Sequence, residues 1–372
     1  MDERALAERL ITYDTSSPDG IKAAAGFVKG WLESHEIEVA AEDINGLPVL
    51  TAVVGDPAPG VPEVVLLGHV DVVPAPAAQF EPRVEGERLI GRGAYDMKGA
   101  LAAIMCALRE MEQLRGVRAR FVCVPDEESE NFDVHAADEL VRRGLRGAFA
   151  ITGEPTDLHV GVQAKGVLMI RLRVHGRAAH GSTPWLGDNA ILKAIDVFRR
   201  IETLPFAAES TDMFDRPSIN LGRLHAGDVV NKVPDAAIMS VDIRYLPGQD
   251  PGAILESIRA IESVEVMRTF IRPPAYVSRS NPYVAELCAA VRRAGQEGST
   301  SVGRDGASDV ISFLEAGVPA VEFGPVGAGH HGPDEWVSIP SLTRYRQALV
   351  DFMHAIPTMG EGGLRAVEGG LA

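Results

Sequence analysis

Five loops in this chain carry a side chain that binds metal ions well, and four of these loops directly follow a short apolar run. Such runs, when bounded by Gly and Pro, are typical of buried strands in a mostly parallel sheet. Because ligands bind outside the carboxyl ends of the strands in such sheets, we expect these side chains to gather at one edge. The runs are 64–67, 121–124, 148–151 and 320–323, the fifth loop is 91–96, and the side chains are His69, Asp96, Glu128, Glu154 and His331.

The length and the charge of the chain limit its organisation and its partners. At 372 residues the chain is too long for one ordinary core, so we expect two domains. Its net charge of −16 argues against nucleic acid or an anionic membrane as a main partner. We expect a cytoplasmic protein, because there is no apolar signal core or spanning segment and the three scattered cysteines indicate buried thiols.

The hydrophobic pattern predicts an α/β fold interrupted by an α+β insert. Alternating strand-like and helix-like segments fill the first part of the chain, with helices expected at 3–13, 20–36, 98–115 and 134–144. The next part follows the order β-α-β-β-α-β of a ferredoxin-like module, with strands at 167–174, 217–224, 236–245 and 264–271 and helices at 188–203 and 251–262. Asp188 is expected to cap the first of these two helices.

The α/β pattern then resumes and completes the first domain. A helix at 283–295, a strand at 318–323 and a helix at 340–355 are expected after Pro282. We therefore predict a discontinuous domain of residues 1–165 and 281–358, an inserted domain of residues 166–280, and a disordered tail of residues 359–372.

A pair of divalent ions needs about four terminal ligands and one carboxylate that bridges them. Histidine and carboxylate ligands together suit zinc, with cobalt or manganese as alternatives. Asp71, two residues after His69, is placed to accept a hydrogen bond from that imidazole. Each side chain also has an ordinary explanation, such as Asp96 capping the helix that follows it. The agreement among four separate strand ends favours a metal site.

The motifs around these residues resemble the dizinc amidohydrolase and exopeptidase family of aminoacylases, acetylornithine deacetylases, succinyl-diaminopimelate desuccinylases and glutamate carboxypeptidases. The resemblance rests on the motifs Gly68-His69-Val70-Asp71, Gly91 to Gly99, Asp126-Glu127-Glu128, Gly153-Glu154-Pro155-Thr156 and His331-Gly332-Pro333-Asp334-Glu335, in order along nearly the whole chain. It implies a catalytic domain of the zinc-peptidase type and a lid that also mediates dimerisation. It implies that His69 and Glu154 hold one metal, Glu128 and His331 hold the other, and Asp96 bridges them. Glu127 would then be the general base.

The resemblance also implies roles for the lid and for the substrate side of the site. His180 matches a lid histidine that stabilises the oxyanion, and that histidine reaches the partner's site in dimeric members. Asn231 and Arg244 resemble substrate-contacting residues of the lid, although a surface ion pair explains Arg244 equally well. Arg304 and Ser308 lie in a substrate-side loop. His330 is ambiguous because it adjoins His331, which has the family spacing to Pro333.

The first functional hypothesis is a metal-dependent hydrolase that cleaves the amide bond of an N-acyl amino acid, of the deacetylase or desuccinylase type. A dipeptidase or carboxypeptidase acting on small peptides is the alternative among enzymes. A catalytically silent binding protein on the same fold is a third possibility, which would be marked by loss of Glu127 or of a ligand, and none is lost. The expected partners are a small-molecule substrate and a second copy of the chain, bound through the lid.

Overall fold

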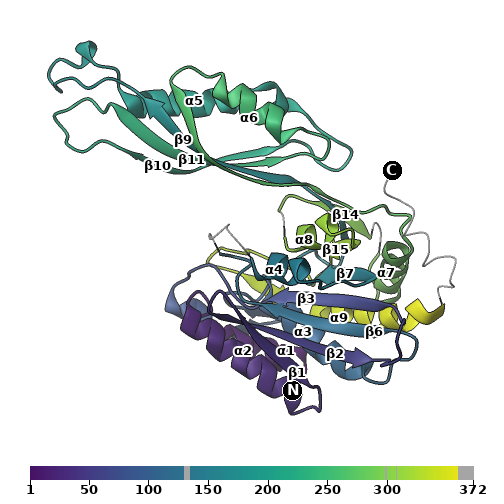
Figure 1. Ribbon diagram of the computed structural model, residues 1–372. Coiled ribbons are helices and arrows are strands. Elements are labelled where there is room, and N and C mark those ends of the chain that lie inside the picture. Colours follow the sequence, from purple (N-terminus) through teal and green to yellow (C-terminus); the bar gives the residue numbers. More distant parts are fainter. Residues whose placement is uncertain (130–134, 298–299, 307, 359–372) are drawn as a thin grey trace. The chain divides into compact units, whose positions relative to one another are not determined.

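The computed structural model describes residues 1–129, 135–297, 300–306 and 308–358 (Figure 1). The predicted tail of residues 359–372 lies outside these described residues. The chain divides into two compact units. The first unit comprises residues 1–162, 277–302 and 308–372, and the second comprises residues 163–276 together with the short return segment 303–307. None of the helices in the described ranges is both long enough and apolar enough to cross a membrane.

The largest sheet among the described residues runs in the order β1-β2-β6-β3-β7-β15-β8-β13, with β14 paired to β8. Its centre is parallel: β3 pairs in parallel with β6 and β7, and β7 pairs in parallel with β15. Val64 to Leu67 of β3 have no exposed surface, as expected for a central strand covered on both faces. The bounds are β1 Val39–Ile44, β2 Leu47–Gly55, β3 Glu63–His69, β6 Arg118–Val124, β7 Phe149–Thr152, β8 Val160–Ala164, β13 Ala275–Tyr276, β14 Ser301–Arg304 and β15 Ala320–Glu322.

Helices pack around this sheet and carry clear start signals. Asp2 caps α1, Ser17 caps α2 ahead of Pro18, and Ser338 caps α9. The α3 helix is almost wholly buried and packs on α1, α9 and β3. The bounds are α1 Glu3–Ile11, α2 Pro18–Glu33, α3 Lys98–Met111, α4 Ala136–Arg142, α7 Pro282–Arg293, α8 Val310–Glu315 and α9 Ile339–Ala355.

A small antiparallel sheet carries the loop with Asp96 and the segment with His331. Its order is β16-β17-β5-β4, with bounds β4 Arg83–Glu85, β5 Arg88–Ile90, β16 Gly327–Ala328 and β17 Trp336–Ser338. The loop 91–96 therefore follows a strand of this small sheet and not a strand of the parallel sheet. Because β5 pairs with β17, this loop and the segment carrying His331 meet at the same place.

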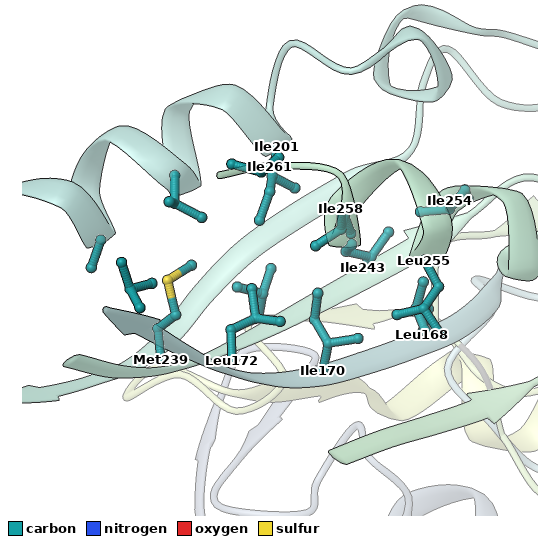
Figure 2. Packing of buried hydrophobic residues seen from close by; sticks show 14 of the residues in the cluster. Leu168, Ile170, Leu172, Ile201, Met239, Ile243, Ile254, Leu255, Ile258 and Ile261 are labelled. Atoms are coloured by element: carbon teal, nitrogen blue, oxygen red, sulfur yellow. The ribbon is translucent and has the colours of Figure 1, made fainter. Parts of the chain in front are cut away.

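The second unit is a four-stranded antiparallel sheet with two helices on one face (Figure 2). The order β10-β11-β9-β12 places the first and third strands of the unit in the middle, as in a ferredoxin-like module. Alternate residues of the strands pack against the helices; Figure 2 shows Leu168, Ile170 and Leu172 of β9 among them. The bounds are β9 Gly166–His175, α5 Ala190–Ile201, β10 Ser218–Ala226, β11 Ala236–Tyr245, α6 Pro251–Arg259 and β12 Val264–Arg272.

One predicted helix cap in the second unit is wrong. The side chain that caps α5 belongs to Asn189, which accepts a hydrogen bond from the backbone N–H of Ile191. Asp188 instead exchanges backbone hydrogen bonds with Arg177 and forms an ion pair with Lys193. Both residue types are good caps, so the sequence alone could not decide between two neighbours.

Candidate metal centre

Three of the predicted ligand loops leave adjacent parallel strands at the same edge of the main sheet. His69 is the last residue of β3 and has no exposed surface. Glu127 and Glu128 follow β6, and Glu154 follows β7. Because β3 lies between β6 and β7, the three loops start side by side. The placement follows the rule that functional side chains of parallel sheets sit beyond the carboxyl ends of the strands.

Asp96 lies at the centre of this group and directs its two carboxylate oxygens to different partners. Its Oδ1 lies 3.3 Å from Nε2 of His69, whose Nε2 is also 3.8 Å from Oε1 of Glu154. Its Oδ2 lies 3.5 Å from Nε2 of His331, whose Nε2 is also 2.8 Å from Oε1 of Glu128. Two triads of potential ligand atoms, each within 4.8 Å of one another, therefore share Asp96.

Asp96 does not act as a helix cap. The helix α3 begins two residues later, at Lys98; its N-cap position is Met97, and no side chain makes a cap hydrogen bond there. The ordinary explanation for an aspartate before a helix is thus absent at this position. Both carboxylate oxygens face the two histidines instead.

Asp71 organises both the histidine and the adjacent acidic loop. The Nδ1 atom of His69 lies 3.1 Å from the backbone oxygen of Asp71 and 3.4 Å from its Oδ1. The same carboxylate accepts hydrogen bonds from the backbone N–H groups of Glu127 and Glu128, at 3.3 and 2.9 Å. The hydrogen bond on Nδ1 leaves Nε2 of His69 directed toward Asp96 and Glu154, as in metal sites whose histidines are oriented through the other ring nitrogen.

The close packing of buried carboxylates and histidines raises the pKa values of several residues in this cluster. Burial raises the pKa of Glu127 well above its ordinary value, and the charge of Glu154 adds to the effect. Burial and the charge of Asp96 do the same to the pKa of Glu154. Although burial alone would lower the pKa of His69, hydrogen bonds to Asp71 and Asp96 raise it well above its ordinary value. Hydrogen bonds to Asp96 and Glu128 raise the pKa of His331 to about 10.

The residues present fit a pair of divalent ions. The Oε1 atom of Glu154 is buried and makes no hydrogen bond, which is costly for a carboxylate unless another ligand satisfies it. The donor set of two imidazoles and several carboxylates suits zinc and related ions. One shared carboxylate with an oxygen toward each triad matches the bridging group that a two-metal site requires.

A buried ion pair, whose role the sequence analysis did not predict, joins the two loops that carry Asp96 and His331. Arg92 and Glu335 are both almost fully buried, with Nη1 and Oε2 2.7 Å apart. Oε1 of Glu335 accepts hydrogen bonds from the backbone N–H groups of Tyr95 and Asp96, at 3.0 and 3.1 Å. Nη2 of Arg92 donates to the backbone oxygens of His331 and Gly332, at 3.1 and 3.2 Å. We call this pair and its backbone contacts the Arg92–Glu335 clamp.

The clamp also explains an unusual backbone conformation. His331 has φ of 60°, in the left-handed region that costs a residue other than glycine about 1–3 kcal/mol. The hydrogen bonds that Arg92 donates to the backbone oxygens of His331 and Gly332 offset that cost. Burial raises the pKa of Glu335, although backbone N–H donors and the charge of Arg92 act in the opposite direction.

His330 lies outside both triads. Its ring contacts those of Tyr95 and His331, with centroid separations of 6.0 and 5.7 Å. The Tyr95 hydroxyl donates to Asp157 at 2.8 Å. Of the two adjacent histidines, His331 is therefore the one whose ring nitrogen reaches the carboxylates.

The remaining predicted residues have internal partners. Ser308 donates its hydroxyl proton to Oε1 of Glu322, a buried residue of β15, at 2.7 Å. In the second unit, Nδ1 of His180 lies 2.7 Å from the hydroxyl of Ser182, and the backbone oxygen of Asn231 accepts the N–H of Gly181. The loops that carry His180 and Asn231 are thus side by side within that unit.

Two arginines of the second unit, Arg244 and Arg304, were predicted as substrate contacts. Arg244 of β11 directs its Nε toward both carboxylate oxygens of Asp242, two residues earlier, at 3.0 and 3.2 Å. The backbone oxygen of Arg304, in β14, accepts the N–H of Lys165. The local ion pair that the sequence offered as an alternative for Arg244 is therefore present.

Comparisons with known proteins agree on one family. The sequence model of peptidase family M20/M25/M40 matches residues 65–355. Acetylornithine deacetylase of Myxococcus xanthus is 32% identical over 93% of this chain and 95% of its own. Succinyl-diaminopimelate desuccinylase of Erythrobacter litoralis is 28% identical over 74% of this chain and 76% of its own. A probable carboxypeptidase of Emericella nidulans is 31% identical over 62% of this chain and 60% of its own.

Solved structures with the same fold cover nearly the whole chain. A tripeptidase from Staphylococcus aureus superposes with a TM-score of 0.79, at 21% identity, covering 96% of this chain and 98% of its own. An M20 family metallo-carboxypeptidase from Sulfolobus solfataricus superposes with a TM-score of 0.77, at 18% identity, covering 96% of this chain and 100% of its own. At this level of identity the superpositions establish the fold.

Proposed function

The chain belongs to peptidase family M20/M25/M40, a family of metallohydrolases that act on amide bonds, and we propose that it removes the acyl group from an N-acyl amino acid. The proposed cofactor is a pair of divalent ions, zinc in the first place and cobalt or manganese as alternatives. The relatives named as deacetylase and desuccinylase support the choice of substrate class.

One observation carries the two-metal proposal. The carboxylate of Asp96 directs Oδ1 toward His69 and Oδ2 toward His331, so it belongs to both triads of potential ligands. In the proposed centre His69 and Glu154 would hold one ion, Glu128 and His331 would hold the other, and Asp96 would contact both.

Glu127 is the proposed general base. When bound, the two ions would supply Lewis acidity, polarising the amide carbonyl and acidifying the attacking water. Glu127 takes the proton of that water as it attacks the carbonyl carbon. It then delivers the proton to the departing nitrogen, so the products are a carboxylic acid and an amine. Support for this role comes from its position directly before the proposed ligand Glu128, on a loop whose backbone N–H groups donate to Asp71.

The second unit is proposed to act as a lid and as the dimer interface. His180 would donate a hydrogen bond to the developing oxyanion, with Asn231, from the adjacent loop, contacting the substrate. Arg244 would bind the substrate carboxylate, and its ion pair with Asp242 would fix the direction of its side chain. Arg304 and Ser308 are proposed as further substrate contacts. In the proposed homodimer, His180 would reach the site of the partner subunit.

A peptidase is the second candidate function, because one similar protein is named as a probable carboxypeptidase. The structures that share the fold include a tripeptidase and a metallo-carboxypeptidase. Both reactions hydrolyse an amide beside a carboxylate, so the same ligands and the same base serve either one.

A hydrolysis screen separates the two candidates. The wild-type protein, loaded with Zn²⁺ or Co²⁺, is assayed with N-acetyl, N-succinyl and N-formyl amino acids beside a panel of dipeptides. The Glu127→Gln variant is the control for contaminating activity. Faster release of the acyl group than of any dipeptide product supports the proposal. Cleavage of dipeptides alone would favour the peptidase hypothesis over the proposed acyl-group removal. No cleavage of either panel would argue against both hypotheses.

A further inference from the structure

Glu154 differs from the other four proposed ligands in how its position is fixed. Two of those four are oriented through Asp71, and the other two lie on loops held by the Arg92–Glu335 clamp. In the part of the chain that the structure describes, neither Asp71 nor the clamp makes a hydrogen bond to residues 153–158. Because Oε1 of Glu154 is buried and makes no hydrogen bond, other contacts must place this carboxylate.

The segment 153–158, which follows β7, runs beside the segment that follows β15. The N–H of Asp157 donates to the backbone oxygen of Pro325 at 3.1 Å, and the N–H of Leu158 donates to that of Gly324 at 2.9 Å. Since β7 and β15 are adjacent parallel strands, both segments leave the same edge of the main sheet. The far end of segment 153–158 is therefore tied to a neighbouring loop.

Two consecutive residues of this segment have a left-handed backbone. The φ angles of Asp157 and Leu158 are 55° and 60°. This region costs free energy for any residue other than glycine, and such residues persist only where the surroundings determine their conformation. Aspartate visits the region more readily than leucine, because its short polar side chain can form hydrogen bonds nearby. The carboxylate of Asp157 is thus the natural anchor of the segment.

Tyr95 supplies the partner of that anchor. Its hydroxyl donates to Oδ1 of Asp157 at 2.8 Å, and the same oxygen accepts the backbone N–H of Gly327 at 3.1 Å. The Tyr95 ring lies against the backbone of Gly327, where a Cβ atom would come within 2.5 Å of a ring carbon. This buried ring is therefore fixed in place, and its hydroxyl joins the loop of Asp96 to the segment that carries Glu154.

We propose that Tyr95 and Asp157 are positioning residues that hold Glu154 where it can bind its metal ion. This inference rests on the proposed two-metal centre and adds the contacts that orient its fifth ligand. Asp157 lies only three residues after Glu154, so a shift of the segment at Asp157 would carry the Glu154 carboxylate away from Asp96. Orienting contacts of this kind typically change metal affinity without touching the metal.

Loss of the Tyr95 hydroxyl should affect one ion and spare the other. In Tyr95→Phe the ring and the backbone N–H remain, so Glu335 still accepts its hydrogen bonds from residue 95 and from Asp96. The hydrogen bonds of Arg92 to the His331 loop are also untouched. The contact that disappears is the one to Asp157, so the change is confined to the segment that carries the first ion's carboxylate ligand.

Competition between the zinc-loaded, full-length protein and a chelator tests the proposal. Glu154→Ala and His331→Ala each remove one ligand and so identify which affinity belongs to which ion. Tyr95→Phe is expected to bind the ion beside Glu154 about 10–100-fold more weakly. The ion beside His331 should stay within about threefold of its wild-type affinity. Unchanged affinities, or equal weakening of both ions, would overturn the proposal.

Matched variants separate this contact from the loss of a buried hydroxyl in general. Tyr345 is fully buried and its hydroxyl makes no hydrogen bond within the described residues, so Tyr345→Phe should leave both affinities unchanged. Asp157→Asn keeps an oxygen acceptor and tolerates the left-handed backbone, so it should stay within about threefold of the wild type. Asp157→Gly also tolerates that backbone but removes the acceptor, and it should weaken the same ion as Tyr95→Phe. Wild-type affinity in Asp157→Gly would overturn the role of Asp157.

The number of ions in the wild-type protein separates this inference from the proposed centre. If the wild type binds two ions and Tyr95→Phe binds both as tightly, the inference alone fails. If the wild type binds only the ion beside Glu154, the two-metal centre fails, and Tyr95→Phe must still weaken that ion. If the wild type binds no ion, or only the one beside His331, Glu154 is not a ligand and both proposals are overturned.

Discussion

Removing the positive half of the Arg92–Glu335 clamp should weaken one of the two proposed metal sites selectively. In Arg92→Gln the buried Glu335 loses its ion-pair partner, and the backbone oxygens of His331 and Gly332 lose their donor. Breaking a buried pair costs about 3–5 kcal/mol. Glu335 keeps the N–H donors of Tyr95 and Asp96, so we expect a cost near 3 kcal/mol.

Metal titration is the appropriate assay, because unfolding of a two-unit chain is not a simple two-state process. Loss of a partner that orients a ligand typically lowers metal affinity 10–100-fold. Competition with a chelator should therefore show one ion bound about 10–100-fold more weakly in Arg92→Gln. The other ion, held by His69 and Glu154, should stay within about threefold of its wild-type affinity.

The double variant Arg92→Gln/Glu335→Gln is the internal control. It removes the uncompensated charge and leaves an acceptor for the Tyr95 and Asp96 N–H groups, so its thermal stability should exceed that of Arg92→Gln. Wild-type affinity for both ions in Arg92→Gln would refute the reasoning. Equal weakening of both ions would also refute it, because Arg92 donates only to the backbone of His331 and Gly332, whereas Glu335 keeps its hydrogen bonds with Tyr95 and Asp96 in the variant.

Three further predictions concern the base, the lid and protons. Glu127→Gln should keep both metals while turnover falls by at least about 10²-fold, and loss of a metal instead would mean that Glu127 is a ligand. His180→Ala should lower turnover at unchanged metal content. If His180 acts on the partner's site, mixing the His180→Ala and Glu127→Gln variants should restore activity. No recovery after proven subunit exchange would exclude action of His180 on the partner's site. Because the pKa of His331 is raised to about 10, metal binding near neutral pH should release at least one proton and affinity should rise with pH. Calorimetry in buffers of different ionisation enthalpy measures that proton, and heat independent of buffer would contradict the prediction.

The sequence was informative where a local pattern decides the structure. The apolar runs before His69, Glu128 and Glu154 are true parallel strands, and a parallel arrangement brings their ends together whatever the details of packing. The long strands and helices of the second unit were likewise predictable, because alternation and periodicity persist over nine or more residues there.

Features that depend on contacts between segments far apart along the chain could not be predicted from the sequence. The loop carrying Asp96 is placed by pairing of β5 with β17, two short strands far apart along the chain. The clamp joins residues 243 positions apart, and only the family motif around Glu335 marked that region. A register shift between Val266 and Arg268 in β12 turns Arg268 to the face of the sheet away from α5 and α6, whereas simple alternation assigns it to the core side.

The central claim is a dinuclear centre built around Asp96, and a crystal structure of the zinc-loaded protein tests it most directly. Anomalous scattering at the zinc edge locates each ion without reference to the assigned ligands. The account predicts two ions about 3.5–4 Å apart, one beside His69 and Glu154 and one beside Glu128 and His331, each bound to a different oxygen of Asp96. A single fully occupied ion, or two ions of which only one contacts Asp96, would contradict it.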